Sequence, residues 1–290
     1  MERFLVVASL TALIHLINTL IYSVRVSGVR TGRLATAISL FNVIFLVSST
    51  ANMIQGPILA TIVEGAIHRG GLTGVTADME RGMNFPPQYL EQIGMLSGEI
   101  RLVILAATAG TLLGAALIPA SAEFFVRAIA VFDRAGSVPV MLVTMLFFPR
   151  RAARYAGEHR HARPAVREAG GAAEKGLPWL FLVMNVLVTG IFTTGVLSAL
   201  YAGALYPGYR ASATMLASVV NGFAQVLFAT VVDPTAARIT DQALQGLRAE
   251  EDVRRMAYLL AGARLAGTIL AQALFIPSAY VVRWVAVSIS

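Results

Sequence analysis

Long stretches without charged side chains constrain this chain more than any other feature of its sequence. Five runs contain no Asp, Glu, Lys or Arg: residues 4–24, 34–63, 102–122, 176–209 and 211–232. Each run is long enough to cross the roughly 30 Å hydrocarbon core of a bilayer as a helix, which satisfies its backbone hydrogen bonds internally. The sequence therefore predicts an all-α integral membrane protein.

Two shorter apolar stretches, residues 135–149 and 265–282, raise the expected number of crossings. With them the chain is expected to have about eight transmembrane helices, with seven as the alternative. Eight requires the residues after Pro277 to cross or re-enter the membrane separately.

The composition excludes several classes of function. The formal charge is +7, but the basic residues lie between apolar runs rather than along one soluble face, so no nucleic acid partner is expected. Cysteine is absent, which excludes disulfides and thiolate catalysis. No nucleophile with a base, paired-carboxylate site or phosphate loop is recognisable. We therefore expect no enzyme, no cofactor and no metal, since His159 and His161 form no closed ligand set.

The basic segment 150–176 predicts the orientation of the chain. Positively charged loops remain in the cytoplasm, where this segment would also contact anionic membrane lipids. Four crossings before it would place the amino terminus in the cytoplasm as well, at the cost of Arg25, Arg30 and Arg33 outside. The expected location is the cytoplasmic membrane.

Several sequence echoes suggest two duplicated membrane halves, residues 1–149 and 177–290, joined by the linker 150–176. Residues 110–119 resemble 267–277, Gly28-Val-Arg30 resembles Gly208-Tyr-Arg210, and residues 57–67 resemble 234–244 with Glu64 matching Asp241. The first half carries an additional segment, 70–100, interpreted as a solvated loop insert that can include one interfacial helix. A parallel repeat would require an even number of crossings in each half.

Polar side chains inside the apolar runs are the main functional clues, because they cost free energy unless they face a cavity or a partner. The first run places Thr11, His15, Asn18, Tyr22 and Arg25 along one helical face. Two interpretations remain open: a seam of hydrogen bonds to a neighbouring helix, or a hydrated groove.

The second run and two later arginines add to these clues. Asn42 and Asn52 lie in the second run before Gly56-Pro57, where a kink or break of the helix is expected. Arg127 lies four residues after Glu123, a spacing that predicts an ion pair. Arg264 has no acidic neighbour at helical spacing, so it is a candidate for contact with a ligand.

The segment 24–35, continuing through Ser39-Leu-Phe-Asn42 to Ala51-Asn-Met-Ile-Gln-Gly-Pro57, resembles the amino-terminal signature of the Amj family. The resemblance covers residues 10–67. Members of that family are alternates to MurJ in lipid II flipping. It implies a flippase whose partner is lipid II, a polyprenyl pyrophosphate that carries a glycopeptide.

The polyprenyl tail of such a substrate is at home in the bilayer, whereas its anionic head needs a hydrated path with cations for the phosphates. His15 and Glu64 are expected to titrate or pair within that path. The substrate-binding candidates are Arg25, Arg30, Arg33, His15, Asn18, Asn42, Asn52, Glu64, Arg127 and Arg264.

Other functions are compatible with the same features. A transporter of another amphiphile, or an ion-coupled solute carrier, would keep the duplicated halves and change the ligand. A membrane enzyme of polyprenyl pyrophosphate metabolism would turn the carrier over rather than move it unchanged.

Overall fold

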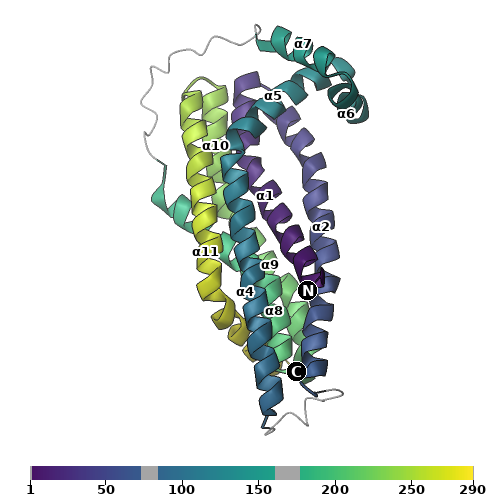
Figure 1. Cartoon of the computed structure of the whole chain (residues 1–290). Coiled ribbons are helices and arrows are strands. Elements are labelled where there is room, and N and C mark those ends of the chain that lie inside the picture. The colour runs from purple at the N-terminus through teal and green to yellow at the C-terminus, as the bar shows by residue number, and fades with distance from the viewer. Residues whose placement is uncertain (1, 73–83, 161–176, 290) are drawn as a thin grey trace.

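A computed structural model of the chain describes residues 2–72, 84–160 and 177–289 and, within these ranges, contains helices and no strands. Figure 1 shows a bundle of long helices with a cap of shorter ones at one end. The long elements before the linker are α1 (Glu2–Thr31), α2 (Leu34–Arg69) and α4 (Pro87–Ala116). After the linker come α8 (Trp179–Leu205), the three-part helix α9–η2–α10 (Arg210–Leu227, Phe228–Val232, Asp233–Leu244) and α11 (Glu250–Ser288).

Six of these segments are long and apolar enough to cross a membrane, namely α1, α2, α4, α8, the unit Pro207–Leu244 and α11. A seventh crossing would need α5 (Ile118–Ala135) and α6 (Val138–Phe147) together, which are bent by 118° at their junction. The predicted count of eight is therefore not confirmed. It counted the residues after Pro277 as a separate segment, whereas α11 continues through this proline to Ser288.

Three crossing helices precede the cap and three follow it, and the two sets run in opposite directions (Figure 1). The end of α1 meets the start of α11, where Arg30 pairs with Glu250. The start of α4 meets the end of α8, where the Tyr89 hydroxyl donates to the Ala204 carbonyl. The six candidate helices therefore form two sets of three with an inverted arrangement, whereas the sequence echoes were interpreted as a parallel repeat with an even number of crossings in each half.

Three local expectations also differ from the structure. The helix α4 starts at Pro87, so much of the predicted loop insert 70–100 is helical, while residues 73–83 lie outside the described residues. The linker begins as α7 (Pro149–Arg160), and residues 161–176 are likewise outside the described residues. The helix α2 is continuous through Pro57, so the expected break does not occur, because one lost backbone hydrogen bond is tolerated within a long helix.

Close helix pairs hold each half together at glycines. A Cβ on Gly110 of α4 would lie 2.0 Å from the Ala12 carbonyl oxygen of α1. A Cβ on Gly267 of α11 would lie 2.6 Å from the Val186 carbonyl oxygen of α8. The echoed segments 110–119 and 267–277 thus make the same kind of contact, each against the first helix of its own half, where only a small residue permits the approach.

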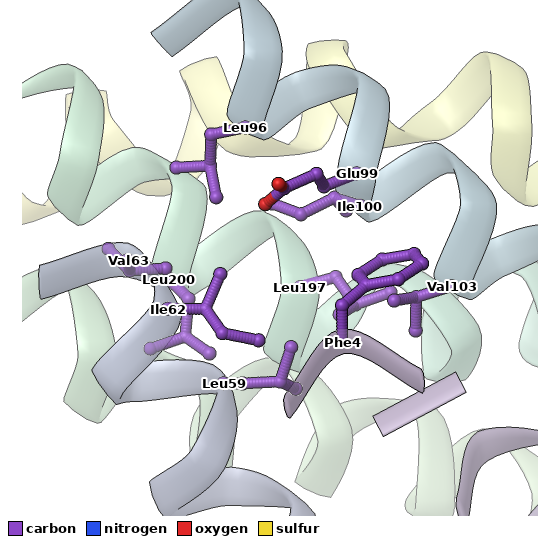
Figure 2. Close-up of a pocket in the computed structure, with 10 residues that line it drawn as sticks. All are labelled: Phe4, Leu59, Ile62, Val63, Leu96, Glu99, Ile100, Val103, Leu197 and Leu200. Carbon is purple, nitrogen blue, oxygen red and sulfur yellow. The ribbon is translucent and has the colours of Figure 1, made fainter. Parts of the chain in front are cut away.

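Away from the cap, apolar side chains pack closely between the helices (Figure 2). Side chains from α1, α2, α4 and α8 surround a residual void of about 10 Å³, which is scarcely enough for one water molecule. Glu99 is the acidic member of the ten residues that line the void. We call this region the sealed end: Phe4, Leu59, Ile62, Val63, Leu96, Glu99, Ile100, Val103, Leu197 and Leu200.

Candidate substrate cavity

A cavity of about 410 Å³ lies nearer the capped end of the bundle, between the two sets of three helices. One wall is α2, with Ile38, Phe41, Asn42 and Phe45, and α9–η2–α10 contributes another. The remaining walls come from α1, α8 and α11. Polar or charged side chains on this mainly apolar lining are Asn18, Tyr22, Arg25, Asn42, Thr189, Gln225, Asp233 and Arg264.

A π-helical turn, η2, forms part of the cavity wall. It directly precedes Asp233-Pro234. Proline has no backbone N–H to donate, and in a regular α-helical turn its ring would clash with the carbonyl four residues earlier. The widened turn lets one continuous helix pass this proline. Such π turns occur frequently at functional sites. An Asp-Pro dipeptide commonly starts a helix, but Asp233 has helical backbone angles and a side chain directed to another helix.

Arg264 of α11 is the most unusual group of the cavity. The residue is only 9 % exposed, and its Nε is a buried donor without a hydrogen-bond partner. Among the described residues its guanidinium forms no ion pair. A buried, unpaired cation is costly, so its presence favours a ligand or water that completes it.

Arg25 of α1 is paired across the cavity with Asp233 of α10. Its side chain is 12 % exposed and that of Asp233 is 51 % exposed. The pair joins helices from different halves. The charges of this pair cancel, so Arg264 leaves the lining with one uncompensated positive charge.

Neutral hydrogen-bonding groups connect neighbouring helices beside these charges, both between the halves and within them. The Tyr22 hydroxyl of α1 lies 3.5 Å from Asn185 Oδ1 of α8, and Asn185 donates to the Leu260 carbonyl of α11 at 3.0 Å. Asn18 accepts from Ser48 at 3.3 Å, while Gln55 donates to Thr11 at 2.7 Å. The polar face predicted for the first helix therefore serves partly as an interhelical seam and partly as a cavity wall.

Four of the ten predicted binding residues line the cavity: Asn18, Arg25, Asn42 and Arg264. Two predicted arginines are instead held by carboxylates at the capped end. Arg30 pairs with Glu123, at 2.8 Å, and with Glu250. Arg33 is exposed and lies 3.6 Å from Asp133.

The other four candidates are outside the cavity lining. His15 is buried between helices, with Nδ1 3.5 Å from the Thr111 hydroxyl. Asn52 and Arg127 are exposed, and Glu123, the expected partner of Arg127, lies 2.8 Å from Arg30. Glu64 pairs with Arg210 at 2.7 Å.

Sequence reasoning missed Gln225 and Asp233 as cavity residues, together with Thr189. The Asp-Pro dipeptide was visible, but a helix start is its commoner role. Only the fold shows that the preceding helix does not end there.

The cavity combines an uncompensated cation, amide side chains and broad apolar walls. Guanidinium groups suit phosphate oxygens because their planar donors bind several oxygens and stay charged. Apolar walls suit a lipid chain. The arrangement fits an amphiphile with an anionic head.

Comparison with known proteins gives a consistent result. The sequence model of a family described as Amj, alternate to MurJ, matches residues 10–286. A relative described as lipid II flippase Amj, from Bacillus subtilis (strain 168), is 33 % identical over 272 residues, which cover 94 % of this chain and 92 % of the relative. No solved structure matches the chain.

Proposed function

The chain belongs to the Amj family, and we propose that it is a flippase that moves lipid II across the cytoplasmic membrane. The description of the relative as a flippase supports transport rather than turnover of the lipid carrier. Transport also agrees with a multi-pass helical architecture.

The single observation that carries the proposal is Arg264, a buried and unpartnered cation in a cavity between the two halves. Moving a pyrophosphate through hydrocarbon requires groups that replace its hydration. Arg264 supplies donors without first having to leave a carboxylate. Arg25 can also bind the phosphate once the phosphate displaces Asp233 from it. Asn18 and Asn42 offer further hydrogen bonds.

The size of the cavity bears on which part of the substrate enters. Sites that enclose a drug-sized molecule have volumes of roughly 300–1,000 Å³. At about 410 Å³ this cavity suits the pyrophosphate and the adjoining sugar. The rest of the glycopeptide would extend into water.

We infer six crossings, with the capped end in the cytoplasm. Basic residues gather at that end, consistent with the positive-inside tendency: Arg25, Arg30, Arg33, Arg127, Arg134, Arg150, Arg151, Arg154, Arg238, Arg248, Arg254 and Arg255. The amino-terminal end of α1 lies in the half of the bundle away from the cap (Figure 1). With the basic cap in the cytoplasm, this placement favours an external amino terminus, which we infer in place of the cytoplasmic one expected from the sequence.

This orientation removes a difficulty of the sequence-based topology. Arg25, Arg30 and Arg33 no longer lie outside the cell but on the same side as the basic linker. The exposed apolar helix α6 would lie in the cytoplasmic leaflet, with Arg150 and Arg151 near anionic headgroups. The cavity then receives lipid II from the side on which it is made.

Depletion of the resident lipid II flippase in a bacterium that expresses this chain tests the proposal. Surface-accessible lipid II should persist with the wild-type chain and fall with Arg264→Gln. Arg127→Gln is a matched control, since it removes an exposed arginine outside the cavity. Absence of surface lipid II despite normal membrane levels of the wild-type chain would refute the function.

A further inference from the structure

Three residues recur at one common spacing in the two halves. Arg33, Pro57 and Glu64 are separated by the same intervals as Arg210, Pro234 and Asp241. The helices begin within one residue of the same register, because α2 starts directly after Arg33 and α9 starts at Arg210. Although the sequence echo paired Arg30 with Arg210, the helix starts favour Arg33 as the counterpart.

At the sealed end, two of these residues form an ion pair. Arg210 Nη1, at the start of α9, lies 2.7 Å from Glu64 Oε2, close to the end of α2. The pair joins one half to the other. It lies at the end of the bundle where the apolar side chains of Figure 2 leave scarcely any space.

The corresponding pair at the cavity end would join Arg33, at the start of α2, to Asp241, close to the end of α10. It is not formed in this structure. Asp241 is exposed, and within the described residues its carboxylate has no ion pair or hydrogen bond. Arg33 lies 3.6 Å from Asp133 of α5 instead.

From this asymmetry we propose that Arg33 and Asp241 form the closing contact of the cavity end in a second conformation. In that conformation the Arg210–Glu64 pair separates and the sealed end opens. Inverted halves can exchange conformations, so that each closed-side contact has an open-side counterpart. The inference rests on the proposed transport function, for which it supplies the gate residues.

The strength of these contacts suits an exchange. The side chains of Arg210 and Glu64 are 44 % and 41 % exposed, and Arg33 is 56 % exposed. Exposed ion pairs contribute little net stability, so neither pair would lock the molecule in one state. The wide contact between Arg33 and Asp133 is also weak enough to be released.

Cysteine pairs test the gate, and the chain has no native cysteine to interfere. One variant carries Glu64→Cys with Arg210→Cys, another Arg33→Cys with Asp241→Cys, and a third carries all four. Treatment with a short bismaleimide should cross-link each pair, but never both pairs in one four-cysteine molecule. Glu251→Cys with Arg254→Cys, an ion pair within α11, should cross-link alongside either of them.

A charge exchange gives an independent readout. Asp241→Arg should slow lipid II flipping severalfold, and addition of Arg33→Asp should restore most of the rate. The combination of Asp241→Arg with Arg30→Asp should not restore it, since Arg30 is held by Glu123 and Glu250.

The possible results separate the two proposals. A wild-type chain that moves lipid II while the Arg33 and Asp241 cysteines never cross-link, or cross-link together with the other pair, overturns the gate. A chain with mutually exclusive cross-links that moves no lipid II supports the gate and overturns the lipid II function.

Discussion

The two ends of the bundle contain the same helices in opposite arrangements. At one end α2 and α9–η2–α10 line a cavity of about 410 Å³. At the other end the Arg210–Glu64 pair joins α2 to α9, beside a void of about 10 Å³. The difference, a hollow toward one end and close packing toward the other, is what the proposed carrier needs before it moves a polar head.

The chemistry of the two ends differs as well. The cavity carries Arg25, Arg264 and several amides, whereas the residues that line the small void are apolar except for Glu99. An anion is therefore stabilised in the cavity and excluded from the sealed end. The barrier to movement lies in the packing of the sealed end, and the attraction for substrate lies in the cavity.

Removal of the free cation should have the largest effect. For Arg264→Gln we expect a flipping rate lower by about tenfold or more, because hydrogen bonds to charged groups contribute roughly 1.5–3 kcal/mol. Thermal stability in detergent should be unchanged or higher, since no partner loses a contact. Unaltered flipping would place the substrate elsewhere in the molecule.

A polar residue introduced into the sealed end should weaken its packing and make that end open more often. Leu200→Gln buries an amide among apolar side chains at a cost of roughly 1–3 kcal/mol, so the closed state should lose about tenfold in population. A cysteine introduced at Val103 should then react with a membrane-impermeant maleimide from that side. Leu146→Gln, on the exposed surface of α6, should leave the labelling rate unchanged.

Removal of the Asp233 carboxylate from the cavity should increase its affinity for anions. Asp233→Asn frees Arg25, and we expect binding of a fluorescent polyprenyl pyrophosphate to tighten about threefold, because a partly exposed pair contributes roughly 0–1 kcal/mol. Glu251→Gln removes the same charge from an exposed pair outside the cavity and serves as the control. Weaker binding by the Asp233 variant would contradict the assignment.

The smallest effect distinguishes two asparagines of one helix. Both Asn42 and Asn52 are exposed on α2, but only Asn42 lines the cavity. We expect Asn42→Ala to slow flipping about twofold, as a neutral hydrogen bond contributes roughly 0.5–1.5 kcal/mol. Asn52→Ala should match the wild type, and equal losses in both variants would mean that the cavity does not define the path.

The sequence predicted the membrane helices, the polar face of α1 and Arg264 as a candidate ligand contact. Each of these depends on residues within one helix. The charge-free runs correspond to α1, α2, α4, α8 and α9–η2–α10. Arg264 was singled out by its lack of an acidic neighbour in sequence, and among the described residues it also lacks one in space.

Features that depend on contacts between distant helices could not be read from spacing. Arg30 appeared free in sequence, yet its partners Glu123 and Glu250 come from α5 and α11. The bend between α5 and α6 and the continuity of α11 through Pro277 changed the number of crossings. Three candidate helices in each set favour an inverted repeat, whereas an even number in each half would favour a parallel one.

Transport of lipid II by the purified protein tests the central claim most directly. Wild-type and Arg264→Gln chains would be reconstituted into vesicles containing lipid II, and its appearance in the outer leaflet would be followed with a membrane-impermeant reagent. We expect rapid exposure of chemically unchanged lipid II with the wild type and about tenfold slower exposure with the variant. Exposure by the wild type no faster than in protein-free vesicles would contradict it.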